Sequence, residues 1–152
     1  MLLATWFGVG LIPVAPGTWG SLAALPFGWA IRSLWGLTGL AVFVAVIFVL
    51  GCWAAGAFAK AAGVSDPGAV VVDEVAGQCL VLLAAPLNPI AWGLAFLLFR
   101  LFDIWKPWPV HWADRHVKGG FGIMLDDVLA AGCAVAALRA LMAIGGIFNV
   151  RS

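Results

Sequence analysis

The chain has 152 residues, of which 64% are hydrophobic and 10% are charged, and its formal net charge is +1. Soluble domains carry roughly 25% charged residues. The 8 basic and 7 acidic side chains of this chain are therefore too few to cover a soluble surface of this size. The small net charge gives no support to nucleic-acid binding. We expect one domain, residues 1–152, embedded in a membrane.

The first part of the chain predicts a broken apolar segment followed by two helices. Residues 1–20 are apolar, but proline and glycine residues near their end indicate a shaped loop, where Thr18 or Ser21 can cap the next helix. Residues 21–36 are short for a membrane span. Residues 38–59 are uncharged and meet the requirement of about 20 apolar residues for a span.

The rest of the chain predicts an interrupted apolar stretch, a polar segment and a last helix. Pro86 and Pro89 divide residues 75–99 into halves that are each too short to cross a hydrocarbon core about 30 Å thick at about 1.5 Å per residue. One kinked crossing or a hairpin of two half-helices fits this pattern. Residues 100–127 hold most of the polar side chains, and residues 128–148 form the last apolar helix.

The acidic residues are confined to one part of the sequence, where basic residues are interleaved with them. Carboxylates from different elements can bind Mg²⁺, which prefers oxygen ligands and bridges to phosphate, while cations face the phosphate oxygens. A solvated loop with weak surface ion pairs is the alternative. In a chain this poor in charge, ionisable groups beside membrane segments favour a functional site. The candidates are Asp73, Glu74, Asp103, Asp114, Asp126 and Asp127, with Lys106, Arg115 and Lys118.

Two backbone features of the polar segment support an anion site. Pro107 and Pro109 restrict the backbone and would hold Lys106 at a fixed angle. The glycine residues that follow Lys118 allow the backbone to approach an anion closely. The pair at residues 126–127 fits either a metal site or a cap of the last helix.

The aromatic residues of the polar segment are open to two interpretations. Trp105, Trp108 and Trp112 fit an interfacial aromatic belt, or a more specific role in holding parts of a lipid. His111 and His116 fit acid–base chemistry, a hydrogen bond to phosphate, or interfacial packing.

Basic residues that flank the acidic stretches predict the orientation in the membrane. These residues are Lys60, Arg100, Lys106, Arg115 and Lys118. If the acidic stretches share one face, the positive-inside rule places that face in the cytoplasm. Residues 75–99 must then form a hairpin, because a single crossing would separate Asp73 from Asp103. The expected fold is all-α: a small multi-pass membrane bundle with broken or re-entrant helices and an active site at the cytoplasmic interface.

Four blocks of the sequence resemble, in order, motifs of the phosphatidylglycerophosphatase A family. The motifs are PGT-x-GS, DE-x-x-G, FR-x-x-D-x-x-KP-x-P and GG-x-G-x-x-x-DD, and the blocks that match them are residues 15–21, 73–77, 99–109 and 119–127. Each motif is weak alone, but the ordered set covers most of the chain and is specific. The chain is therefore similar to this family along most of its length.

The resemblance implies a magnesium-dependent lipid phosphatase that hydrolyses phosphatidylglycerophosphate to phosphatidylglycerol and inorganic phosphate in the bacterial inner membrane. The metal ligands that it implies, by matching position, are Asp73, Glu74, Asp103, Asp126 and Asp127. The phosphate-binding residues that it implies are Lys106, Arg100 and Arg115, with Thr18 donating a hydrogen bond. Together with the residue patterns, this assigns catalysis to Asp103, Asp73, Lys106 and Arg115. Substrate binding is assigned to Thr18, Arg100, Lys118, His111 and His116.

The expected reaction is metal-assisted hydrolysis of a phosphomonoester, in which Asp103 or Asp73 takes the proton of the attacking water. An intermediate with phosphate on Asp103 is the alternative, although the D-x-D-x-[TV] motif that favours it is absent from the sequence.

Two other classes of protein are weighed against this reaction. A CDP-alcohol phosphotransferase also uses aspartates and magnesium, but its D-G-x-x-A-R motif is absent. A non-enzymatic transporter or scaffold predicts charges inside the spans, where only Arg32 and Arg139 lie. A homo-oligomer is compatible with the sequence.

Overall fold

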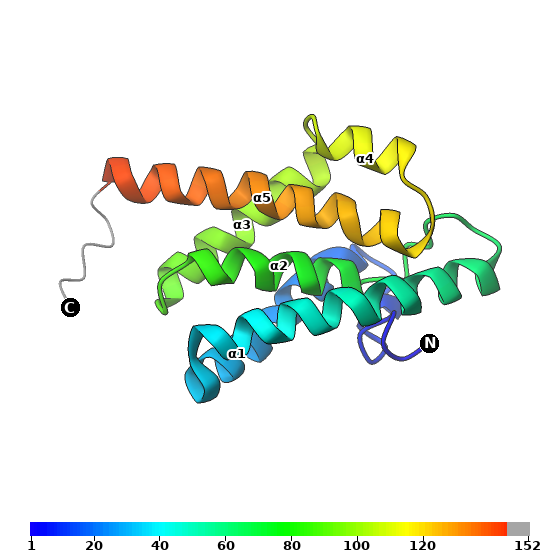
Figure 1. Cartoon of the computed structure of the whole chain (residues 1–152), viewed down its shortest axis with the longest axis horizontal. Helices are drawn as coiled ribbons and strands as arrows, with labels where there is room; N and C mark the ends of the chain where they lie inside the picture. The colour runs from blue at the N-terminus through cyan, green and yellow to red at the C-terminus, as the bar shows by residue number, and fades with distance from the viewer. Residues whose placement is uncertain (146–152) are drawn as a thin grey trace.

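The computed structural model describes residues 1–145, so the last three residues of the helix predicted over 128–148 lie outside the described part. The described residues form helices and no strand, which confirms the predicted all-α class (Figure 1). The elements are a short 3-10 helix η1 (Val9–Leu11) and the helices α1 (Pro16–Ala62), α2 (Val72–Ala84), α3 (Pro89–Trp105), α4 (Val110–His116) and α5 (Gly119–Gly145).

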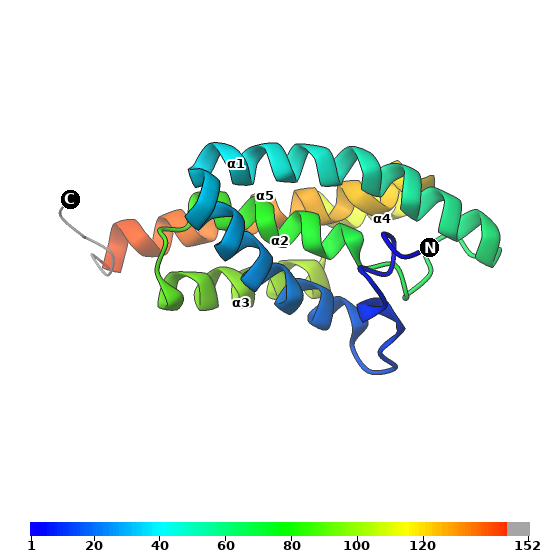
Figure 2. The same ribbon diagram turned by 90° about the horizontal axis from the view of Figure 1, so that it is seen from below.

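Helix α1 consists of two halves that meet at Gly36. The φ of 67° and ψ of −166° at Gly36 are not helical, and a positive φ of this size favours glycine. The chain reverses there, so the second half runs back past the first (Figure 2). The boundary predicted between residues 21–36 and 38–59 is therefore confirmed.

The start of α1 differs from the expectation. The helix already begins at Pro16, and no side chain caps this end. The proposed capping role of Thr18 or Ser21 is therefore wrong, because both residues lie inside the first turns. The Ser21 hydroxyl instead donates a hydrogen bond to the Gly17 carbonyl at 3.0 Å.

Helices α2 and α3 form a hairpin, one of the two arrangements that the prolines allowed (Figures 1 and 2). The Asn88 side chain caps α3 by accepting hydrogen bonds from the Ile90 and Ala91 amides at 2.8 and 3.2 Å. At the turn, the Arg32 guanidinium donates to the Leu82 carbonyl at 2.7 Å. The hairpin brings the start of α2 and the end of α3 to the same end of the molecule.

Helix α2 is the central helix and packs against α1, α3 and α5. The core consists mainly of aliphatic and small residues, and its largest fully buried apolar side chains include Phe99, Leu40, Leu82, Met124 and Leu138. Glycine permits close helix contacts: a Cβ on Gly120 would lie 1.8 Å from the Cys52 carbonyl oxygen, so only glycine fits between α5 and α1.

Within residues 1–145, two helices are long and apolar enough to cross a membrane, namely Pro16–Ala62 and Gly119–Ile144. Large apolar side chains also cover the outside of the bundle, among them Leu34, Trp35, Val49 and Trp53. Lipid is the solvent that suits such a surface. These features support membrane association of the chain.

The N-terminal segment holds the start of α2 in place. The Ala4 carbonyl accepts hydrogen bonds from the Val71 and Val72 amides at 2.9 and 3.2 Å. These bonds satisfy backbone donors at the beginning of a helix, where no intrahelical acceptor exists. The Trp6 ring packs edge-to-face on Phe27 of α1, with 5.3 Å between the ring centroids.

Candidate active site

A pocket of about 290 Å³ lies where the first turns of α1 and α2 meet the end of α3 and the α5 residues Asp126 and Asp127. The loop between α1 and α2 supplies one wall. The charged residues that line this pocket are Asp66, Asp73, Glu74, Arg100, Asp103, Lys106, Asp126 and Asp127. These residues come from four separate parts of the sequence. Most of the acidic and basic candidates from the sequence analysis therefore lie in one pocket.

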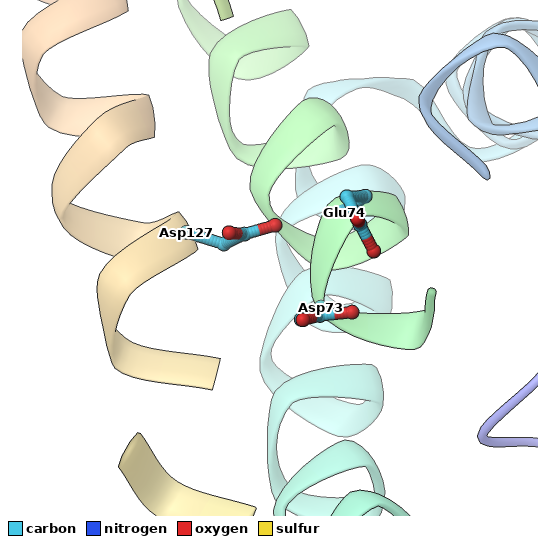
Figure 3. A group of neighbouring side chains, drawn as sticks. All are labelled: Asp73, Glu74 and Asp127. Carbon is cyan, nitrogen blue, oxygen red and sulfur yellow. The ribbon is translucent and has the colours of Figure 1, made fainter. Parts of the chain in front are cut away.

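Three carboxylates form the innermost group of the pocket. One oxygen from each of Asp73, Glu74 and Asp127 lies within 4.8 Å of the others (Figure 3). Neighbouring residues on a helix point about 100° apart, so the adjacent pair on α2 needs a third carboxylate from elsewhere to enclose an ion. Asp127 of α5 supplies that third carboxylate.

Each of these three carboxylates has a buried oxygen without a hydrogen-bond partner. The atoms are Oδ1 of Asp73, Oε2 of Glu74 and Oδ2 of Asp127. A buried acceptor left unpaired costs about 1–3 kcal/mol, and more when it is charged. A cation bound among these three carboxylates would give such oxygens a partner.

Electrostatics lead to the same conclusion. Burial raises the pKa of the Asp73 carboxyl well above its usual range, and the nearby charge of Glu74 raises it further. Burial also raises the pKa of Glu74. A divalent cation would offset both causes. Carboxylate oxygens are the ligands that Mg²⁺ prefers, so these three residues would suit such an ion.

Two cations face the acids from the α3 side. Arg100 forms an ion pair with Asp103 one turn along α3, and its guanidinium also lies 3.5 Å from the Ser21 hydroxyl. The Lys106 ammonium donates to Asp114 and to Asp126, each at 2.8 Å. Burial alone lowers the pKa of Lys106, but the two hydrogen bonds outweigh it and raise the pKa above its usual value. The lysine therefore stays charged.

Two glycines of the sequence motifs, Gly17 and Gly77, lie where a larger residue would collide with residues around the pocket. A Cβ on Gly17 would lie 2.1 Å from Oε1 of Glu74, and a Cβ on Gly77 would lie 2.7 Å from the Phe99 ring. The same Cβ on Gly77 would lie 3.1 Å from the Asp127 carbonyl oxygen. Glycine at these positions lets α1, α3 and α5 approach α2 closely enough to close the pocket.

Several predicted site residues lie outside the pocket lining. Thr18 is half-buried on α1, while His111, Arg115 and His116 are exposed on α4. Lys118 is exposed and donates to the Asp114 backbone carbonyl at 3.2 Å. Lys118 lines a separate cavity of about 30 Å³.

Two sequence interpretations change with the structure. The capping role considered for residues 126–127 is wrong, because α5 already begins at Gly119 and places the pair inside the helix. Asp66 was not among the site candidates, yet it lines both the pocket and the small cavity beside it. Its position in a polar loop just before α2 was the only sequence signal.

The fold and site define a class of protein: an all-helical, membrane-associated protein with a pocket of carboxylates and cations suited to a metal ion and a phosphate. A family model described as Phosphatidylglycerophosphatase A matches residues 2–142. The chain belongs to the phosphatidylglycerophosphatase A family. This confirms the resemblance, and it makes the chain a member of an enzyme family.

Individual relatives agree with this assignment. The chain is 47% identical over 131 residues to phosphatidylglycerophosphatase A of Escherichia coli, covering 85% of this chain and 75% of the relative. It is 48% identical over 141 residues to the protein of that name from Haemophilus influenzae, covering 92% and 86%. A Bacteroides thetaiotaomicron protein, 44% identical over 138 residues (86% and 85% covered), is provisionally named a phosphatidylinositol-3-phosphatase. No solved structure gives a significant match.

Proposed function

We propose that the chain hydrolyses phosphatidylglycerophosphate to phosphatidylglycerol and inorganic phosphate, with Mg²⁺ as its metal. The family and two of its named relatives support the substrate. The observation that carries the site is the set of three unpartnered carboxylate oxygens next to two cations in one pocket. A phosphate monoester has the charge and the oxygens that such a pocket binds.

The metal would be held by Asp73, Glu74 and Asp127, which each offer one oxygen within 4.8 Å of the others. Once bound, Mg²⁺ would neutralise charge on the phosphate oxygens. Asp103 and Asp126 are expected metal ligands too, but Arg100 and Lys106 already engage them. We therefore place these two acids at the rim of the metal site, where they position the cations.

The chain's own residues account for the rest of the reaction. Arg100 and Lys106 bind the phosphate oxygens and stabilise the charge that spreads over them in the transition state. Asp103 accepts the proton of the water that attacks phosphorus. The water oxygen bonds to phosphorus as the bond between phosphorus and the glycerol oxygen breaks. The glycerol oxygen takes the proton that Asp103 accepted, so phosphatidylglycerol and inorganic phosphate are released.

The arrangement in the membrane is part of the proposal. We place the pocket at the cytoplasmic side of a bacterial inner membrane, where the flanking Lys and Arg residues favour it. The 13 residues of α2 and 17 of α3 extend about 20 and 26 Å at about 1.5 Å per residue. Both are shorter than a core about 30 Å thick, so the hairpin is re-entrant. Residues 1–152 act as a single multi-pass domain.

The test is a phosphate-release assay on the purified protein in detergent, with and without Mg²⁺. The panel contains phosphatidylglycerophosphate, phosphatidate, phosphatidylinositol 3-phosphate and a soluble phosphomonoester. We expect the fastest release from phosphatidylglycerophosphate, and loss of activity with a chelator or with Asp103→Asn. Faster release from phosphatidylinositol 3-phosphate would show that the inositol lipid is the preferred substrate. Activity that survives chelation would show that the reaction needs no metal.

A further inference from the structure

Helix α4 turns one face to the bundle and another to the outside. Val110 and Ala113 are buried, and α4 packs against α5. The exposed side chains of the same helix are His111, Trp112, Arg115 and His116. Three of the side chains that the sequence assigned to substrate binding or catalysis, namely His111, Arg115 and His116, therefore lie on this outer face.

The acids of the same stretch are paired with cations. Asp103 lines the pocket, and Asp114 accepts a hydrogen bond from Lys106 at 2.8 Å. The outer face of α4 thus presents the charged Arg115 beside two histidines, while the neighbouring carboxylates are neutralised by ion pairs with Arg100 and Lys106. This separation of charge gives the face a positive character that suits an anionic partner.

Exposed aromatic residues extend this face to the end of α3. Trp108 is 82% exposed and Trp105 is 67% exposed. Tryptophan favours the boundary between hydrocarbon and headgroups, because its ring is apolar and its N–H is polar. Basic side chains beside interfacial aromatic rings are attracted to anionic lipid headgroups.

We propose that the α4 surface, formed by Trp105, Trp108, His111, Trp112, Arg115 and His116, binds anionic phospholipid headgroups next to the active site. Lys106 joins α4 to the pocket, because its ammonium bonds both Asp114 and Asp126. A lipid held on this surface therefore lies beside the wall of the phosphate pocket. The surface concentrates anionic lipids, the substrate class included, and in that respect it rests on the proposed function.

Binding is measured without catalysis, on purified full-length protein in neutral detergent micelles. Brominated phosphatidylserine is the anionic probe, brominated phosphatidylcholine is the zwitterionic probe, and quenching of tryptophan fluorescence is the readout. One basic side chain near an anionic surface is expected to change binding about fivefold. Arg115→Gln should therefore raise the half-saturating fraction of phosphatidylserine by about that factor, with little change for phosphatidylcholine.

The matched control is Lys60→Gln, which removes the same charge from an exposed residue in the last turn of α1. This variant should lose less phosphatidylserine binding than Arg115→Gln, because Lys60 lies outside the α4 surface. At about 1 M salt the screening length falls to about 3 Å, so the preference for phosphatidylserine should disappear. Equal losses in both variants, equal binding of both lipids, or a dimer that buries α4 would each overturn the proposal. An inactive protein that passes this assay would overturn only the proposed function.

Discussion

Gly17 in the first turn of α1 lies directly against the carboxylate of Glu74 in α2. A Cβ at Gly17 would stand 2.1 Å from Oε1 of Glu74 and 3.3 Å from a terminal nitrogen of Arg100. A single missing methyl group therefore allows the start of α1 to lie against both the Glu74 carboxylate and the Arg100 guanidinium. The PGT-x-GS motif and the DE-x-x-G motif thus meet at the contact between Gly17 and Glu74.

Gly17→Ala is expected to abolish most activity, because the added methyl group must push Glu74 or α1 away. Overpacking of this kind typically costs about 1–3 kcal/mol of stability. Gly132→Ala on α5 is the matched control, because nothing lies within 4 Å of its Cβ position. Phosphate release and thermal unfolding of both variants provide the measurement. Normal activity in Gly17→Ala would show that Glu74 has no fixed place in the site.

Asp127→Asn is expected to weaken metal binding strongly. The substitution replaces a buried carboxylate that has an unpartnered oxygen with a neutral amide of nearly the same shape. A ligand that binds only the folded state stabilises it by about 2.7 kcal/mol at 100 times its dissociation constant. Adding Mg²⁺ should therefore raise the melting temperature of the unmodified protein and leave that of Asp127→Asn nearly unchanged. Equal shifts in the two proteins would place the metal elsewhere.

The metal-free protein is expected to lose stability as the pH rises. The folded-state pKa of Asp73 is raised by burial and by Glu74, and that of Glu74 is raised by burial. The folded chain then binds more protons than the unfolded chain above the ordinary pKa near 4. The free energy of unfolding is therefore highest near that pH and falls as the pH rises through the raised values.

Thermal unfolding at pH 5 and pH 8, with a chelator or with Mg²⁺, tests this pH dependence. The melting temperature should fall toward pH 8 in chelator, and Mg²⁺ should offset the fall because it binds the ionised carboxylates. Asp73→Asn removes one of these titrating carboxyls and should reduce the slope in chelator. A slope that is unchanged in this variant would assign the pH dependence to other groups.

The sequence could predict that Asp73, Glu74 and Lys106 meet because these residues lie at element ends that the fold brings together. Asp73 and Glu74 follow a polar loop at the start of α2, and Lys106 ends α3, so a hairpin at the prolines is sufficient to join them. The choice between the hairpin and a kinked crossing required the structure. It depends on tertiary contacts such as the Arg32 bond to the Leu82 carbonyl, which leave no local sequence pattern.

The sequence did not determine where Arg115 and Asp66 lie, because neither residue has a local pattern that shows which way its side chain faces. Asp114 and Arg115 are adjacent on α4 and point about 100° apart, so only one of them can face Lys106. Asp114 does so, and Arg115 remains exposed. A helix of seven residues is too short for periodicity to reveal which side is buried. Asp66 reaches the pocket only through the path of its loop, which composition does not determine.

Lys106→Gln is expected to reduce turnover by about a hundredfold or more, the usual effect of removing one donor that stabilises transition-state charge. The lysine bonds Asp114 and Asp126 as well, so its loss also leaves two carboxylates without a counter-charge. Lys106→Arg is the comparison variant. It keeps the positive charge, but the planar guanidinium cannot take the place of the compact lysine ammonium between Asp114 and Asp126. It should recover stability but only part of the activity. If a double variant, Lys106→Gln with Asp126→Asn, regained full activity, the lysine would act only by balancing Asp126 and would have no contact with phosphate.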